Sequence, residues 1–157
     1  KLNKSLLLLS KIDNSQFASV EKVCLNEILY RYLDDYQEVY DYKGITLDVH
    51  EKNTFNITMN GTLAVVLITN LLKNAFVHNI YKGKIQIEIT SSNIRFGNTG
   101  KDEHLDEKHI FERFYQGSKK EGSTGLGLAI VDAICRQSQL SIQYQFVKGW
   151  HWFDISC

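Results

Sequence analysis

Short segments in which apolar and polar residues alternate recur along this chain, and they limit its fold more than any other feature. Between residues 84 and 90, for example, Ile85, Ile87 and Ile89 alternate with polar residues. Such alternation is typical of a β-strand that buries one face. Comparable runs predict strands at residues 22–25, 45–50, 54–59, 93–97, 141–147 and 150–156. Lys148 and Gly149 separate the last two runs, which predicts a hairpin.

Segments with helical spacing of apolar residues lie between these strands. They predict helices at residues 1–16, 62–79 and 126–137, and one that begins at an N-cap residue, Asn26, and is stopped by Gly44. Helices interleaved with hairpins and strands indicate the α+β class. The expected architecture is a two-layer α/β sandwich, in which a mixed, mostly antiparallel sheet is covered on one face by helices.

The size and charge of the chain argue against several classes of protein. Its 157 residues favour one domain, and its 18 basic and 18 acidic residues leave no net field to attract nucleic acid. Three dispersed cysteines suggest neither a zinc site nor a disulfide scaffold, and they suit a reducing compartment. The longest apolar runs, at residues 6–9 and 63–68, are too short to span a membrane, and no signal peptide is evident. Because the sequence begins with Lys1, we expect a fragment of a longer chain.

Three glycines, Gly122, Gly125 and Gly127, stand directly before an apolar stretch in EGSTGLGLAIV, where the helix predicted at 126–137 begins. A helix N-terminus attracts anions, and glycines allow the backbone to approach a phosphate closely. This interpretation competes with a glycine-rich turn that binds nothing. No Gly-Lys-Ser/Thr follows and no strand leads straight into the stretch, which argues against a phosphate loop of that type and against a dinucleotide fingerprint.

A polar stripe runs along the helix predicted at 62–79. Asn70, Asn74 and His78 are spaced by four residues, so they share one helix face. Asparagine is unfavourable inside a helix, and an amide oxygen suits a hard cation such as Mg²⁺. The stripe therefore indicates a wall that faces a ligand, although a polar seam against another element remains an alternative.

Four segments in order, NLLKNAFVHN, IRFGNTG, IFERFYQ and GSTGLGLAIV, resemble the motifs of the ATP-binding domain of sensor histidine kinases. That superfamily also includes DNA gyrase, mismatch-repair ATPases and heat-shock chaperone ATPases. The segment SLLLLSKIDNSQF resembles the end of the second helix of the kinase's dimerisation and phosphoacceptor hairpin. The resemblance implies a Bergerat-type fold, with residues 1–16 as the end of that hairpin and residues 17–157 as the ATP-binding domain.

The resemblance also implies roles for individual residues. It makes Asn74 the magnesium ligand, Asn70 its companion one turn earlier and His78 a residue near the phosphates. Arg113 is the implied catalytic cation near the triphosphate, and Phe111 is an aromatic anchor of the lid. The other implied nucleotide-binding residues are Asn98 and Gly100 at the adenine, and Gly122, Thr124, Gly125, Leu126, Gly127 and Leu128 over the phosphates.

The implied reaction is transfer of the γ-phosphoryl group of Mg-ATP to a histidine on the hairpin, then relay to a response-regulator aspartate. The acceptor histidine is expected upstream of Lys1. The implied partners are ATP with Mg²⁺, the protein's own hairpin and a response regulator, and the full-length protein is expected to be a homodimer. The domain is expected on the cytoplasmic side of an inner-membrane sensor.

Two departures from the family pattern keep alternatives open. Asn98 stands where the family has aspartate, and Val77 stands where a basic residue is common. A kinase-inactive nucleotide-binding or interaction module is therefore an alternative, as is another branch of the superfamily. The helix at 1–16 carries a stripe of apolar residues, for which we expect a partner outside the domain, such as a second copy. Its members are Leu2, Leu6, Leu9 and Ile12.

Overall fold

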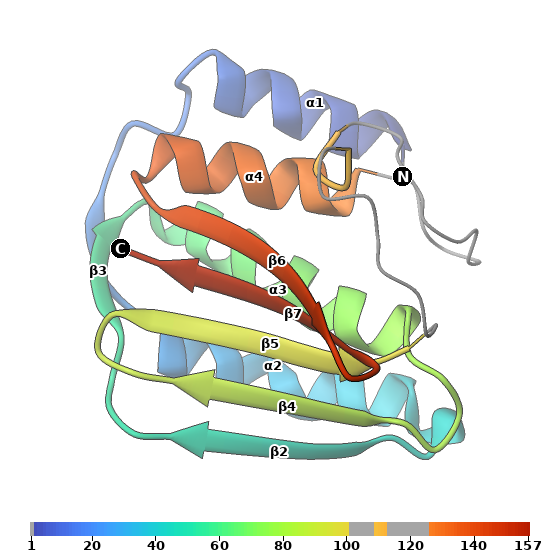
Figure 1. Cartoon of the computed structure of the whole chain (residues 1–157). Helices are drawn as coiled ribbons and strands as arrows, with labels where there is room; N and C mark the ends of the chain where they lie inside the picture. Colours follow the sequence, from blue (N-terminus) through green and yellow to red (C-terminus); the bar gives the residue numbers. More distant parts are fainter. Residues whose placement is uncertain (1, 101–108, 113–125) are drawn as a thin grey trace.

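The computed structural model describes residues 2–100, 109–112 and 126–157. The α-helices there are α1 (Leu2–Asp13), α2 (Leu25–Val39), α3 (Gly61–Val77) and α4 (Gly127–Gln137), and a short 3-10 helix, η1 (Asp41–Lys43), follows α2. The strands are β1 (Glu21–Cys24), β2 (Thr46–Glu51), β3 (Asn56–Met59), β4 (Lys84–Ile89), β5 (Asn93–Thr99), β6 (Ser141–Val147) and β7 (Trp150–Ser156). Figure 1 shows their arrangement along the chain.

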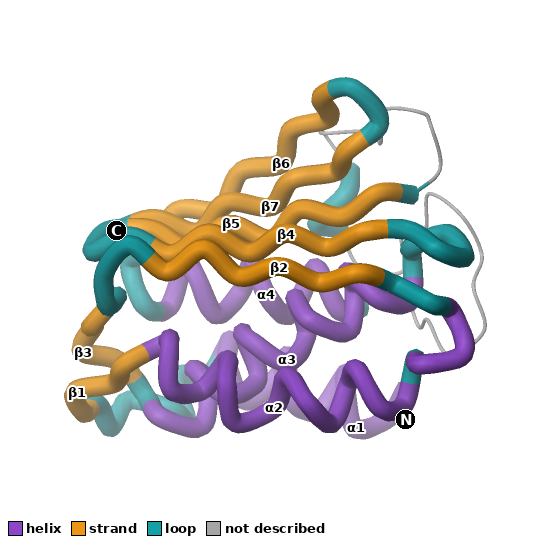
Figure 2. The backbone as a smooth tube through the Cα atoms, turned by 90° about the horizontal axis from the view of Figure 1, so that it is seen from below, coloured by secondary structure: helices purple, strands orange, loops and turns teal. Residues whose placement is uncertain are grey.

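A five-stranded sheet in the order β2-β4-β5-β7-β6 forms one layer. β2 pairs with β4 in parallel, and the other neighbours are antiparallel. Figure 2 shows the α-helices together on one side of this sheet, and β1 and β3 form a separate two-stranded ribbon. The predicted two-layer architecture, with a mixed and mostly antiparallel sheet covered on one face, is confirmed.

The core lies between the sheet and the helices. Ile87, Phe96 and Phe153 point from β4, β5 and β7 toward the helices and are buried. Leu67 and Leu71 of α3 are buried with them, since α3 packs against α2, α4 and the sheet. Fully burying one such side chain contributes about 1.5–3 kcal/mol. α3, which carries the polar stripe, is therefore held in this core by contacts with α2, α4 and the sheet.

The first helix packs within the domain, contrary to expectation. α1 lies along α4 (Figure 1), and Leu9 and Ile12 are only 1% and 3% exposed. The expectation that this apolar stripe lacks a partner in its own chain is therefore wrong. Its partner is a helix from the far end of the sequence, which helical spacing alone does not reveal.

Asn26 does not cap α2 as predicted. The helix begins at Leu25, and Asn26 is buried within its first turn. Its amide nitrogen donates to the Glu51 carboxylate and to the Asn53 carbonyl at 2.9 Å, while its oxygen accepts from the Phe55 amide at 2.8 Å. These bonds fasten the segment between β2 and β3 to α2, which is why a polar side chain is buried here.

Two devices fix the far ends of α2 and α3. α2 ends at Val39 instead of continuing to Gly44, and Gly44, with a positive φ of 63°, closes η1. The adjacent Lys43 donates from Nζ to the carbonyl oxygens of Phe76, Val77 and Asn79, at 2.9, 3.0 and 3.2 Å. A lysine at the negative end of a helix dipole is stabilising, so η1 anchors the C-terminus of α3.

Among the described residues no helix is both long and apolar enough to cross a membrane.

The three cysteines should react with a thiol reagent in the order of their exposure. Cys157 is exposed and Cys24 partly buried, whereas burial, reinforced by Asp132, raises the pKa of the Cys135 thiol to about 12. Because the thiolate is the nucleophile, Cys135 should stay unlabelled by a maleimide at pH 8. Mass spectrometry of peptides after timed labelling checks this. Labelling in urea provides the control, and Cys135 reacting as fast as Cys157 without urea would contradict the burial of α4.

Candidate functional site

The polar stripe of α3 lies at the edge of the core, as predicted. Asn70, Asn74 and His78 are each partly buried, whereas their neighbours Leu71 and Ala75 are fully buried. At 1.5 Å of rise per residue, the stripe is about 12 Å long. The structure shows no hydrogen bond from the Asn74 side chain to another described residue, so its amide is available to a ligand.

One end of the stripe lies beside the N-terminus of α4. The Asn70 amide nitrogen donates to the Val66 carbonyl at 2.8 Å, which directs the amide oxygen away from the helix backbone. A side chain at Gly127 would begin 3.3 Å from that oxygen. Leu126, the N-cap residue of α4, provides no side-chain cap for the first turn. Backbone N–H groups that favour an anion therefore lie next to Asn70.

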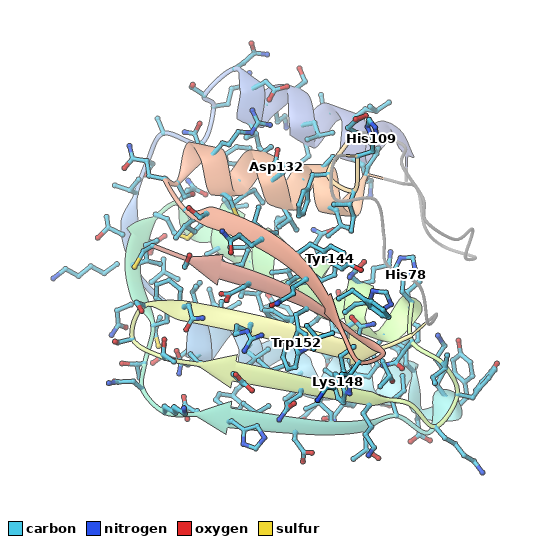
Figure 3. All side chains as sticks on the ribbon, in the orientation of Figure 1. His78, His109, Asp132, Tyr144, Lys148 and Trp152 are labelled. Carbon is cyan, nitrogen blue, oxygen red and sulfur yellow. The ribbon has the colours of Figure 1, made fainter. Side chains whose placement is uncertain are left out.

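The other end of the stripe meets the end of β5. His78 is the C-cap residue of α3, and a side chain at Gly100 would begin 2.9 Å from its carbonyl oxygen. The same position lies 3.3 Å from Cδ2 of His151 and 3.4 Å from Nδ2 of Asn98. α3, β5 and β7 therefore converge at Gly100, where only a glycine fits. Figure 3 shows His78 at this end of α3.

The side chain of Asn98, beside Gly100, contains a buried hydrogen-bond acceptor that has no donor. It is 2% exposed, and its Nδ2 donates to the Thr99 carbonyl at 2.9 Å, which fixes which side of the amide carries the oxygen. The oxygen, Oδ1, has no hydrogen-bond partner. Since leaving such an acceptor unpaired costs about 1–3 kcal/mol, Asn98 fits a ligand that brings a donor.

His151 was missed by the sequence analysis and belongs to the same place. It lies directly opposite Asn98 in the pairing of β5 with β7, is 5% exposed, and its Nδ1 is 2.7 Å from the Tyr144 hydroxyl. Alternation along the strand could have found His151, since a strand that puts Trp150 and Trp152 on one face puts His151 on the other.

The strand β5 continues to Thr99 instead of ending at residue 97, because its pairing with β7 extends it.

Alternation along β7 puts Trp150 and Trp152 on the face of the sheet opposite His151; Figure 3 labels Trp152. Trp150 and Trp152 stack with ring centroids 5.7 Å apart, and Trp152 lies over Gly97, where a side chain would overlap the ring. The Arg95 guanidinium is 4.4 Å from the Trp152 centroid and pairs with Glu88 and Asp154. A cavity of about 310 Å³ opens here, but its charged groups already neutralise one another.

The remaining predicted residues divide into two groups. Leu128 packs against the hydrophobic core, and Phe111 meets Phe153 edge to face at 6.4 Å. Four predicted residues lie outside the described part of the chain: Arg113, Gly122, Thr124 and Gly125. Within the described part, no three His, Cys, Asp or Glu side chains cluster as a metal site. An amide oxygen is nevertheless a suitable ligand for Mg²⁺, which often completes its shell with phosphates and water.

Comparisons with known proteins show the family and the fold of the chain. The profile of the family described as "Histidine kinase-, DNA gyrase B-, and HSP90-like ATPase" matches residues 59–151. The heme sensor protein HssS of Staphylococcus epidermidis is 33% identical over 139 residues, which are 85% of this chain and 31% of HssS. The chain thus spans about a third of the length of that curated relative.

Two solved structures share the fold. The mycobacterial sensor histidine kinase MprB superposes with a TM-score of 0.73 over 87% of this chain and 95% of its own, at 19% identity. The cytoplasmic segment of histidine kinase QseC gives a TM-score of 0.75 over 99% of this chain and 93% of its own, at 15% identity. At these identities the likeness concerns the fold.

Proposed function

The chain belongs to the family of histidine kinase-, DNA gyrase B- and HSP90-like ATPases, as the catalytic ATPase domain of a sensor histidine kinase, and we propose that it binds Mg-ATP for transfer of the γ-phosphoryl group to a histidine. The observation that carries this proposal is the orphaned acceptor of Asn98 at one end of the α3 stripe, with helix N–H groups at the other. A nucleotide suits both ends of the site, since its base supplies a hydrogen-bond donor for Asn98 and its phosphates supply negative charge for the N-terminus of α4.

Each end of the site has a defined task in this proposal. Asn98 accepts a hydrogen bond from the adenine amino group, and the first turn of α4 receives the phosphates. Asn74 would hold Mg²⁺ by its amide oxygen, and Asn70 would orient the phosphates beside Gly127. The metal, when bound, neutralises phosphate charge. Arg113 and the glycines Gly122 and Gly125 are proposed to act near the phosphates, and positioning with charge neutralisation supplies the catalysis. His78, which was expected near the phosphates, lies instead at the Gly100 end of the stripe.

The wider assignments are also proposals. Residues 1–16 are proposed as the end of a dimerisation and phosphoacceptor hairpin, and residues 17–157 as the ATP-binding domain. The acceptor histidine would lie upstream, a response regulator would receive the phosphoryl group, and the full-length protein would be a homodimer. The domain would face the cytoplasm in a membrane sensor. HssS, by its name a heme sensor, supports only the assignment to a sensor protein.

A kinase-inactive nucleotide-binding module is the second candidate. Asn98 replaces a family carboxylate, and Val77 is 7% exposed at a position where the family often has a cation. A buried valine offers no charge to a phosphate. Radioactive γ-phosphate transfer in a longer form of the protein that includes the upstream hairpin separates the two candidates, because only the kinase labels a histidine.

Asn98 should decide the preference for adenine. We expect wild type to bind ADP more tightly than GDP, because guanine has a carbonyl oxygen at position 6 in place of the amino group from which Oδ1 accepts a hydrogen bond. Asn98→Ala should weaken ADP binding, and Asn98→Asp should hold or strengthen it, since charged hydrogen bonds contribute about 1.5–3 kcal/mol against about 0.5–1.5 for neutral ones. Isothermal titration calorimetry of the three proteins with both nucleotides measures this. Equal ADP affinity in wild type and Asn98→Ala would remove Asn98 from the site.

A further inference from the structure

We propose that Asn79 and Thr99 are positioning residues for the nucleotide base, which act by fixing the orientation of the Asn98 side-chain amide. This inference rests on the proposed function and adds to it the residues that decide which atom of Asn98 the base meets. It follows from a chain of hydrogen bonds that joins the end of α3 to the last two residues of β5.

Asn79 is the fixed end of this hydrogen-bond chain. It follows the C-cap residue of α3 and is 2% exposed. The backbone N–H of Ile80 can only donate, so the Asn79 side-chain atom 2.9 Å from it is the oxygen, Oδ1. The nitrogen, Nδ2, donates to the Lys84 carbonyl at 3.0 Å, and the Asn79 carbonyl accepts from Lys43 Nζ at 3.2 Å. Asn79 is therefore held through both its side chain and its backbone.

Thr99 links Asn79 to Asn98. The Lys84 backbone N–H donates to the Thr99 hydroxyl oxygen at 2.8 Å, and the hydroxyl donates its own proton to Asn79 Oδ1 at 2.7 Å. The pairing of β4 with β5 ends at Ile85 and Asn98, so the N–H of the next residue, Lys84, goes to the hydroxyl of Thr99 and not to its carbonyl. The Thr99 carbonyl is therefore left to accept from the Asn98 side chain, at 2.9 Å.

The orientation of the Asn98 amide follows from these bonds. A carbonyl oxygen can only accept, so the Asn98 atom that it contacts is Nδ2, and the unpaired oxygen occupies the other side of the amide. Without the Thr99 hydroxyl, the Lys84 N–H is expected to turn to the Thr99 carbonyl and to compete with Asn98 for it. An amide that turned over would present a donor, which repels the amino group of adenine.

Gly83 provides the space in which Asn79 and Thr99 meet. A side chain at Gly83 would begin 2.0 Å from Asn79 Oδ1 and 2.6 Å from the Thr99 hydroxyl oxygen. Only a glycine therefore fits in the turn before β4. Gly83→Ala consequently separates the two oxygens without removing any hydrogen-bonding side chain, which makes it a second, independent way to break the chain.

A nucleotide that lacks one group tests the positioning role. Purine riboside 5′-diphosphate carries hydrogen where ADP carries the amino group. Isothermal titration calorimetry should show wild type binding ADP about threefold to tenfold more tightly than this analogue, the range of one neutral hydrogen bond. Thr99→Val, which keeps the branched shape but loses the hydroxyl, should lower the ratio to less than about twofold. Thr99→Ser, which keeps the hydroxyl, should retain the wild-type ratio, and Gly83→Ala should lower it.

Thr90→Val is the matched control. It makes the same substitution at the other end of the β4–β5 hairpin, where the Thr90 hydroxyl accepts from the Asn93 N–H at 3.1 Å. It removes a partly buried hydroxyl far from Asn98 along the strands, so it should keep the wild-type ratio.

A double variant distinguishes positioning from a purely structural role. If Thr99 acts through Asn98, adding Thr99→Val to Asn98→Ala should leave the ligand ratio of Asn98→Ala unchanged. A structural role would lower the melting temperature of Thr99→Val and weaken both ligands alike. A ratio in Thr99→Val equal to that of wild type would therefore overturn the proposal.

Nuclear magnetic resonance gives a readout that needs no nucleotide. The side-chain amide protons of Asn98 should exchange with water more slowly than those of the exposed Asn53, and Thr99→Val should speed their exchange while Thr99→Ser should not. If Thr99→Val does not fold, the wild-type spectrum and Gly83→Ala still decide. Asn98 amide protons that exchange as fast as those of Asn53 in wild type would show that the amide is not held.

The outcomes separate this inference from the function on which it rests. Wild type that prefers ADP, together with a Thr99→Val variant that keeps this preference, refutes the positioning role and leaves Mg-ATP binding standing. Wild type that binds ADP and the analogue equally refutes base reading by Asn98, and with it this inference, but not Mg-ATP binding. Wild type that binds neither nucleotide refutes both.

Discussion

Replacing Asn74 with alanine is expected to weaken binding of Mg-ATP by more than tenfold, or about 1.4 kcal/mol, while the fold remains intact. Alanine is the residue that a helix interior tolerates best, and the Asn74 side chain bonds to no other described residue. The loss of affinity should therefore come only from the lost contact with Mg²⁺. Calorimetric titration with and without Mg²⁺ measures it, and the gain in affinity that Mg²⁺ gives wild type should be absent from the variant.

Lys73→Ala provides the matched control for this experiment. Lys73 precedes Asn74 in α3 but is exposed, so its replacement should leave the magnesium-dependent affinity close to that of wild type. Equal affinities of Asn74→Ala and wild type in Mg²⁺ would show that Asn74 is not a metal ligand. The search for the ligand would then turn to Asn70, one turn earlier on the stripe.

Leu9→Ala should destabilise the domain by about 2–5 kcal/mol, the usual range for a leucine removed from a core. Leu9 is 1% exposed between α1 and the rest of the core, so alanine leaves a cavity. For a chain of this size each kcal/mol corresponds to about 2–4 °C, and the melting temperature should fall by on the order of 10 °C. Differential scanning calorimetry measures the change.

Leu7→Ala is the matched control, since Leu7 lies on the same helix and is 57% exposed. It should change stability by at most about 0.5 kcal/mol. A melting temperature for Leu9→Ala equal to that of wild type would show that α1 is not part of this core in solution. Sedimentation of both variants should then reveal whether the stripe joins two copies instead.

The elements that were predicted correctly depend on local patterns. The hairpin of β6 and β7 follows from alternation around Lys148 and Gly149, and α4 follows from helical spacing after the glycines. The errors concern contacts between distant segments. Asparagine is a residue type that favours the N-cap position, but the side-chain amide of Asn26 forms hydrogen bonds with the backbone that follows β2. These tertiary hydrogen bonds outweigh its preference for capping a helix. The partner of α1 is similarly invisible to a local pattern.

The candidate site shows the same division. The face shared by Asn70, Asn74 and His78 could be predicted, because spacing along one helix fixes it. The position of His151 opposite Asn98 could not, because it depends on the register that places β7 beside β5. Sequence alternation shows which face a residue occupies, and only the pairing of strands shows what lies opposite.

The stacked tryptophans give this domain an optical property. Trp150 and Trp152, with centroids 5.7 Å apart and planes 18° apart, are close enough for their electronic transitions to couple. They flank His151 on β7, and Trp152 lies on the bare backbone of Gly97, one residue before Asn98. A natural chromophore pair therefore lies against the part of β5 that carries Asn98. A shift of β5 or β7 on nucleotide binding would alter its fluorescence and circular dichroism without an attached label.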